Sequence, residues 1–281
     1  MEYKQFKEAL IKELRKSFPD YEVEEKFEDS ISIRVPGSRI APAYRVKAIY
    51  EEEKEVTEKL MDGLIKNIEE AIENVPDIDT KKFMDFEKSK KNLIVVLMPA
   101  HKVRENAVQS RLTDGISIVV RVNLEIGTVL CTKEICNGRG VTEEEVIEAA
   151  KSNIKGKYAG TIEDLLQVVK EMMGGIDIDA FIGAEDKDPI DRQYVVRTIY
   201  ENFGASAILQ RGVQKELENI FGSKFVLLPS SIHEVIAFKY DEELMDTYRE
   251  MLESANDESV REEDFLSNNV LIYENGEIRE V

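Results

Sequence analysis

The chain has 281 residues, of which 42% are hydrophobic and 34% charged, a balance that excludes an intrinsically disordered protein. Its formal net charge of −19 argues against direct binding to nucleic-acid phosphates or anionic membrane surfaces, because both rely on a surplus of Lys and Arg. The longest apolar run, Leu93 to Ala100, is far shorter than the ~20 residues that cross a bilayer. We therefore expect a globular, cytoplasmic protein with neither a nucleic-acid nor a membrane partner.

The first part of the chain predicts two amphipathic helices and a hairpin. Apolar residues recur at helical spacing from Tyr3 to Phe18, which predicts a helix over about residues 3–17. The β-rich segments 21–27 and 30–35 predict two paired strands. A second helical stripe, from Val56 to Ile72, predicts a long helix with one broad buried face.

The middle of the chain is rich in predicted strands. The apolar run Leu93 to Met98 predicts one strand, which Pro99 stops. Segments 116–124 and 128–132 predict a second hairpin across a short turn with glycine. Neighbouring strands of this kind favour antiparallel pairing.

Two patterns of Thr followed three residues later by an acidic residue predict helix starts. Thr142 and Glu145 form a capping box that opens a helix. Thr161 and Asp164 have the same spacing and predict another helix, which ends at Gly174-Gly175. The acidic segment 176–193 follows, and we expect it to be an irregular linker or lid.

The last third of the chain predicts alternating strands and helices. The expected elements are, in order, a strand near Tyr194, a helix over 206–221, strands over 225–228 and 232–238, a helix capped by Asp241, and a closing hairpin that turns at 274–276.

These elements predict an α+β fold, in which mainly antiparallel strands pack against amphipathic helices. The expected sheet is covered on one side by the helices 56–72, 206–221 and 241–255. The chain is expected to be one domain over 1–281. A division into two lobes, 1–175 and 194–281, joined by segment 176–193, is the alternative organisation.

Cys131 and Cys136 are the only cysteines of the chain. In a cytoplasmic protein they are expected to be free thiols, and their spacing matches no zinc pattern. No phosphate-binding loop, nucleophile elbow or EF-hand loop is complete in the sequence. We therefore expect no cofactor and no metal.

The strongest candidate site is the segment that holds Ser230, Ser231, His233 and Glu234, where one of two histidines lies beside two hydroxyls and a carboxylate. In an extended strand His233 and Glu234 point to opposite faces, so they do not form a dyad. A hydrolase would use His233 with Ser230 or Ser231 and a distant carboxylate, and no such carboxylate is identifiable from spacing. The favoured interpretation is a hydrogen-bonded, partly buried histidine; a ligand or partner site ranks next.

Three segments resemble a known family: Tyr194-Val195-Val196, the run Phe203 to Leu209, and Leu228-Pro229-Ser230-Ser231-Ile232-His233-Glu234-Val235. The family contains uncharacterised proteins of Gram-positive anaerobic bacteria and is known only as a domain of unknown function. The Leu-Pro-Ser-Ser-Ile-His-Glu run is the most specific element of the resemblance. The resemblance extends over nearly the whole chain and implies a bacterial protein; it carries no activity, cofactor or catalytic residue.

The leading functional hypothesis is a non-catalytic protein that binds a protein or small-molecule partner, because no catalytic constellation is complete. The first alternative is the hydrolase with His233. The second is an acidic mimic of nucleic acid, which requires the carboxylates to form one continuous stripe.

Overall fold

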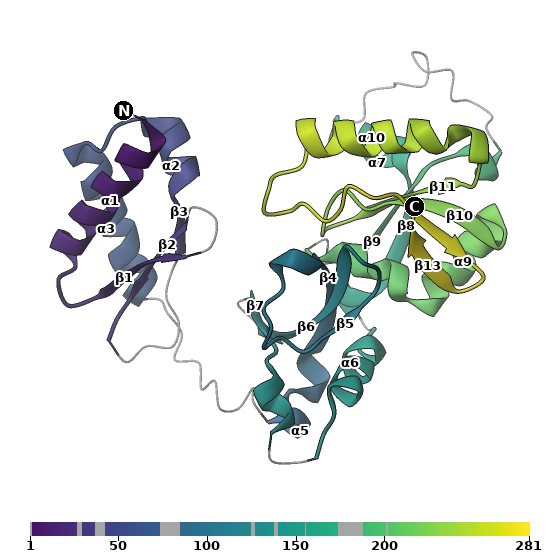
Figure 1. Ribbon diagram of the computed structural model, residues 1–281, viewed down its shortest axis with the longest axis horizontal. Helices are drawn as coiled ribbons and strands as arrows, with labels where there is room; N and C mark the ends of the chain where they lie inside the picture. Colours follow the sequence, from purple (N-terminus) through teal and green to yellow (C-terminus); the bar gives the residue numbers. More distant parts are fainter. Residues whose placement is uncertain are drawn as a thin grey trace. The chain divides into compact units, whose positions relative to one another are not determined.

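The structure, a computed structural model, describes residues 2–26, 30–36, 43–73, 85–124, 127–137, 140–154, 156–173, 188–200 and 202–281 (Figure 1). The chain forms two compact units, Met1–Thr80 and Lys81–Val281. Every strand pairing in the described residues is antiparallel, and amphipathic helices pack on the sheets. The predicted α+β class is confirmed. None of the described helices is long and apolar enough to span a bilayer.

In its described residues, the first unit combines three helices with a three-stranded sheet. Its elements are α1 (Tyr3–Ser17), β1 (Glu22–Lys26), β2 (Ser30–Arg34), β3 (Ala43–Arg45), α2 (Val46–Glu53) and α3 (Glu58–Glu73), with β2 at the centre of the sheet. The helical stripe of Phe6, Leu10 and Leu14 is buried in one cluster with Ile31 and Ile33 of β2. The helices and the hairpin predicted for this part of the chain are confirmed.

A four-stranded sheet begins the second unit. Strand β6 (Ile116–Leu124) pairs with β4 (Leu93–Pro99) along one edge and with β5 (Gln109–Arg111) and β7 (Gly127–Leu130) along the other. The helical elements beside this sheet include α5 (Phe86–Ser89), the 3₁₀ helix Lys90–Asn92 and α6 (Glu143–Ser152). The Asn153 amide after α6 donates to the carbonyls of Lys90 and Leu93, at 2.7 and 2.8 Å, and so fixes the helix end at the start of β4.

The second sheet has six strands. Their order is β13 (Glu277–Glu280), β12 (Leu271–Glu274), β10 (Lys224–Leu228), β11 (Val235–Lys239), β9 (Tyr194–Thr198) and β8 (Gly160–Asp164). Side chains alternate between its faces. Phe225 and Leu227 pack with α9 (Arg211–Phe221), the 3₁₀ helix Gly204–Leu209 and the four-stranded sheet. Val226 and Leu228 pack on the other face with α10 (Met245–Glu258).

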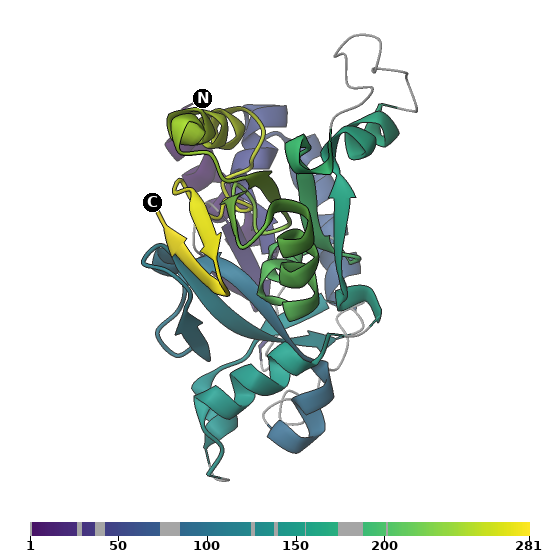
Figure 2. The ribbon, with the colours of Figure 1, turned by 90° about the vertical axis from the view of Figure 1, so that its right-hand side faces the viewer.

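The terminal hairpin joins the two sheets. Glu280 accepts hydrogen bonds from the Thr113 hydroxyl at 2.7 Å and from the Gly115 amide at 3.1 Å, both in the turn before β6. Figure 2 shows this hairpin, in yellow, beside the blue strands of the four-stranded sheet. Asn275 and Gly276 turn the hairpin with positive φ values of 52° and 98°, as their sequence predicts.

The expected arrangement of the helices differs from the structure. The helices do not share one side: α9 and α10 lie on opposite faces of the six-stranded sheet, and α3 belongs to the first unit. Strands β8 and β9 pair across segment 176–193, and the described residues on both sides of it belong to the second unit. Positions 174–187 of that segment lie outside the described residues.

One predicted helix start is wrong. Residues Gly160–Asp164 form strand β8, in which Thr161 pairs with Arg197, and the helix α7 (Leu165–Met172) begins only afterwards. Asp164 is its cap, because its carboxylate accepts from the Leu166 amide at 2.9 Å. The capping box of Thr142 and Glu145 is confirmed.

Candidate functional site

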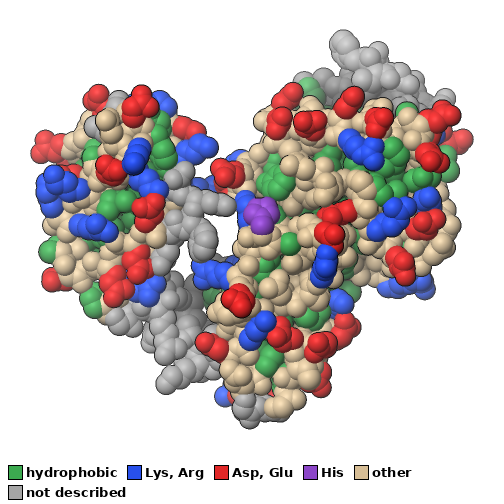
Figure 3. All heavy atoms as spheres, in the orientation of Figure 1, with side chains coloured by type: hydrophobic (Ala, Val, Ile, Leu, Met, Phe, Trp, Pro, Cys, Tyr) green, Lys and Arg blue, Asp and Glu red, His purple; other side chains and the backbone are tan. Residues whose placement is uncertain are grey.

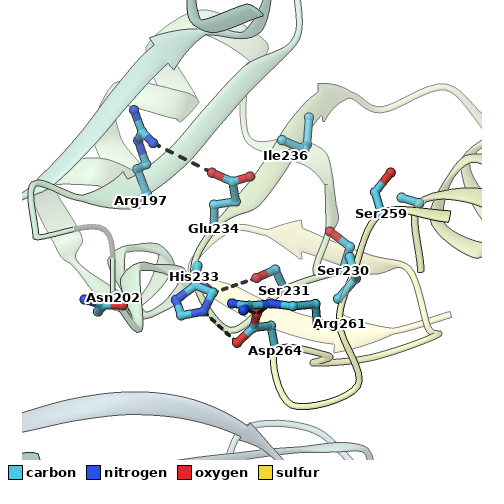
Figure 4. Close-up of a pocket in the computed structure, with 12 residues that line it drawn as sticks. Arg197, Asn202, Ser230, Ser231, His233, Glu234, Ile236, Ser259, Arg261 and Asp264 are labelled. Atoms are coloured by element: carbon cyan, nitrogen blue, oxygen red, sulfur yellow. Dashed lines mark hydrogen bonds and ion pairs between the residues drawn. The ribbon is translucent and has the colours of Figure 1, made fainter. Parts of the chain in front are cut away.

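The segment between β10 and β11 lies against the loop that follows α10. Ile232 donates its amide to the Asp264 carbonyl at 2.8 Å, and Leu266 donates to the Ser230 carbonyl at 3.1 Å. A pocket of about 580 Å³ opens beside these two segments (Figure 4). We call it the His233 pocket; it is lined by Arg197, Asn202, Ser230, Ser231, His233, Glu234, Ile236, Ala255, Ser259, Val260, Arg261 and Asp264. The four residues singled out in the sequence thus lie together at one pocket.

The imidazole of His233 is bound by the protein through both ring nitrogens. Its Nδ1 accepts the backbone N–H of Phe203 at 3.2 Å. Its Nε2 lies 2.9 Å from Oδ1 of Asp264. Because Nδ1 accepts an N–H, the proton of the neutral ring is assigned to Nε2, which donates it to the carboxylate. Neither nitrogen is left to serve a ligand in this arrangement.

Asp264 connects the histidine to a guanidinium. Its Oδ2 accepts from Arg261 Nε at 2.7 Å, while Oδ1 accepts from His233. Burial alone would raise the pKa of Asp264, but the hydrogen bonds from His233 and Arg261 outweigh it and lower this pKa below its usual value of 3.8. The ionised carboxylate therefore holds two chain segments together.

Phe203 and Gly204 form the support beneath His233. Phe203 has a left-handed backbone, with φ of 59°, which is uncommon for a bulky residue and directs its amide at the histidine ring. A Cβ at Gly204 would lie 2.3 Å from the His233 carbonyl oxygen. Glycine is thus required here for close approach, while the positive φ belongs to the residue before it.

The two serines do not bind the imidazole. The Ser231 hydroxyl accepts the backbone N–H of His233 at 3.0 Å and so shapes the turn. Ser230 lines the pocket, and its carbonyl is used by Leu266. Figure 4 labels both side chains at the pocket and marks the hydrogen bond of the Ser231 hydroxyl with a dashed line.

Glu234 faces the pocket with a weak partner. Its carboxylate lies 3.9 Å from Arg197, beyond hydrogen-bond distance. Arg197 forms its close ion pair with Glu163 of β8, at 3.0 Å. That hydrogen bond outweighs burial and lowers the pKa of Glu163. Because Arg197 is already engaged, the Glu234 carboxylate stays available to a ligand.

Sequence reasoning did not identify Asp264 as a site residue. It lies 31 positions from its partner His233, within a run of acidic residues. The expected strand over 232–238 begins only at Val235, and His233 lies in the preceding bend. The alternation argument for His233 therefore does not apply. The His233 side chain is hydrogen-bonded and partly exposed, with 29% of it accessible.

Cys131 and Cys136 are free thiols. Burial, with a smaller effect of Cys136, raises the pKa of Cys131 to about 12. Burial and the nearby glutamates of α6 also raise the pKa of Cys136. Both side chains are therefore protonated at neutral pH, a form that neither attacks substrates nor binds metals well. Among the described residues, no cluster of three His, Cys, Asp or Glu side chains is placed to hold a metal ion.

The comparison with protein families shows which family the chain belongs to. A model described as a family of unknown function, DUF5688, matches residues 3–275, and the chain belongs to this family. No curated protein and no solved structure matches the chain.

Proposed function

We propose that this member of the DUF5688 family is a non-catalytic binding protein whose ligand or partner segment enters the His233 pocket. One observation carries the proposal. Both ring nitrogens of His233 are bound by Phe203 and Asp264, while a pocket of about 580 Å³ stays open beside them. Its volume is in the range of known ligand sites. The histidine then acts as a rigid wall of the pocket.

The hydrolase alternative has less support. A serine nucleophile needs an imidazole nitrogen that takes its proton, while a carboxylate orients the other nitrogen. Asp264 is the orienting carboxylate of such a triad, but Nδ1 accepts an amide of the protein and Ser231 is bound to the backbone. A catalytic cycle would have to break the Phe203 bond first.

An acidic mimic of nucleic acid also has less support. Figure 3 shows Asp and Glu side chains interspersed with Lys and Arg on the face that it presents, and not arranged as one stripe. The net charge of −19 instead suits a partner of opposite charge. For the setting we propose the bacterial cytoplasm, supported by the family resemblance and by the free thiols of Cys131 and Cys136.

Two measurements on the full chain test the proposal. In a fragment screen followed by NMR, we expect amide shifts to cluster at Ser230, His233 and Glu234. With a fluorophosphonate, which labels nucleophilic serines, we expect no adduct at Ser230 or Ser231. Labelling that disappears in His233→Ala would establish the hydrolase instead. If the fragments shift only amide signals outside the His233 pocket, the binding proposal is wrong.

A further inference from the structure

The His233 pocket is one end of a longer depression along α10. A hollow of about 430 Å³ adjoins it and shares Ala255 and Ser259 with it. A third hollow, of about 420 Å³, shares Thr247 and Met251 with the second. We call the three together the α10 groove. Helix α10 has 14 residues, so the groove follows it for roughly 21 Å.

The far end of the groove is apolar. Leu165, Ile190, Leu244 and Met251 line it, together with Phe238 of β11. Ile190, Leu244 and Met251 are 43%, 38% and 43% exposed, which is high for large apolar side chains gathered at one place. Such a cluster indicates a contact surface for an apolar side chain.

Each cation that lines the groove has a carboxylate partner. Lys239 and Arg192 pair with Asp191 and Asp164, at 2.5 and 3.2 Å. Arg197 and Arg261, at the other end, pair with Glu163 and Asp264. The positive charge of the groove is thus neutralised within the protein.

Several carboxylates of the groove are not neutralised in this way. Within the part of the chain that the structure describes, Glu250 and Glu258 of α10 have no hydrogen-bond or ion-pair partner. Among the described residues, the Glu234 carboxylate has only the contact of 3.9 Å with Arg197. The available charge is therefore negative along the middle of the groove and at its His233 end.

We infer that the α10 groove binds a basic, amphipathic segment of a partner protein, an inference that rests on the proposed function of the His233 pocket. An apolar side chain of the segment packs between Ile190 and Leu244. Lys or Arg side chains then face Glu250, Glu258 and Glu234 in turn. An extended segment of about six or seven residues spans this length. Charge complementarity gives such a segment both its orientation and fast association.

The probe is a fluorescein-labelled synthetic peptide of 12 residues, with Leu near one end and three Lys after it. Fluorescence anisotropy measures its affinity for the full chain. The double variant Glu250→Lys, Glu258→Lys is expected to weaken binding on the order of tenfold. The matched control is Glu253→Lys, Asp257→Lys, which makes the same charge change on the same helix at exposed positions outside the groove. We expect about a twofold effect or less from it.

A second pair of variants tests the apolar end. Leu244→Ser is expected to weaken peptide binding several-fold. The control is Ile199→Ser, at an exposed side chain outside the groove, which is expected to leave the affinity unchanged. Melting curves verify that all variants fold. Equal losses in both charge variants would overturn the inference, as would a dimer of the chain that Glu250→Lys, Glu258→Lys dissolves. If the peptide does not bind while fragments still shift the amide signals of the His233 pocket, the inference about the α10 groove is wrong and the proposed function stands. If neither the peptide nor the fragments bind, the proposed function is wrong too.

Discussion

Gly204 lies so close to His233 that a β-carbon at position 204 would be 2.3 Å from the carbonyl oxygen of the histidine. The Ala205 amide donates to the neighbouring Ile232 carbonyl at 3.2 Å. The start of the 3₁₀ helix Gly204–Leu209 therefore packs directly on the backbone of the His233 segment. The pocket wall owes its position to this contact between two backbones.

Gly204→Ala is expected to destabilise the protein by about 1–3 kcal/mol, because its methyl group must displace backbone and cannot rotate away. Denaturant unfolding measures the change. Gly212→Ala is the matched control: this glycine lies in α9 with open space around its Cβ position. We expect it to be neutral or to stabilise by up to about 1 kcal/mol. Equal effects of the two substitutions would contradict the packing argument.

His233→Ala is expected to cost about 1–3 kcal/mol, because it leaves the Phe203 amide and one oxygen of Asp264 without their partner. His101→Ala, at an exposed histidine, is the control and should stay within about 0.5 kcal/mol. A double-mutant cycle of His233→Ala with Asp264→Ala should give a coupling of about 0.5–3 kcal/mol. An unchanged melting temperature in His233→Ala would show that the ring is not structural.

Acid should weaken the contact between the two segments that Asp264 joins. The pKa of this carboxyl is lowered by folding, so its stabilising effect is complete above the ordinary pKa of 3.8 and is lost as the pH falls through the lowered value. Urea unfolding between about pH 6 and pH 2 measures the slope of the free energy of unfolding against pH. Asp264→Asn should flatten this slope, and Asp257→Asn, at an exposed position of α10, should not. A slope that Asp264→Asn leaves intact would assign the acid sensitivity to other groups.

Thr142→Ala is expected to cost about 0.5–2 kcal/mol, because the Thr142 hydroxyl caps the Glu145 amide at the start of α6. Thr142→Ser keeps the hydroxyl and should retain nearly all of the stability. Thermal or urea unfolding of the three proteins makes the comparison. A serine variant as unstable as the alanine variant would point to packing of the Thr methyl group.

Local signals in the sequence predicted local structure well. The i, i+4 stripe of α1, the capping box at Thr142 and the Asn275-Gly276 turn each act within a few residues, and each is confirmed. Thr161 shows where this fails. Its spacing to Asp164 is that of a helix start, but pairing with Arg197 of β9 makes the segment a strand and leaves Asp164 as the cap.

The grouping of the candidate residues could be predicted from the sequence, and their hydrogen-bond partners could not. The run from Ser230 to Glu234 does line one pocket. Its partners Phe203 and Asp264 come from segments 30 and 31 positions away, which no periodicity or motif connects to His233. Asp264 is also one of many acidic residues in this stretch of the sequence, so nothing distinguishes it from its acidic neighbours as the partner of His233.

Strands β8 and β9 lie side by side although the chain between them is long. Their ladder runs from Gly160 paired with Thr198 to Asp164 paired with Tyr194. A chain cut between Met173 and Asp188 leaves both strands of this ladder whole, and pairing them again carries the entropic cost of joining two separate chains. The protein is therefore suited to fragment complementation: two pieces, produced separately, would regenerate the six-stranded sheet and with it the wall of the His233 pocket.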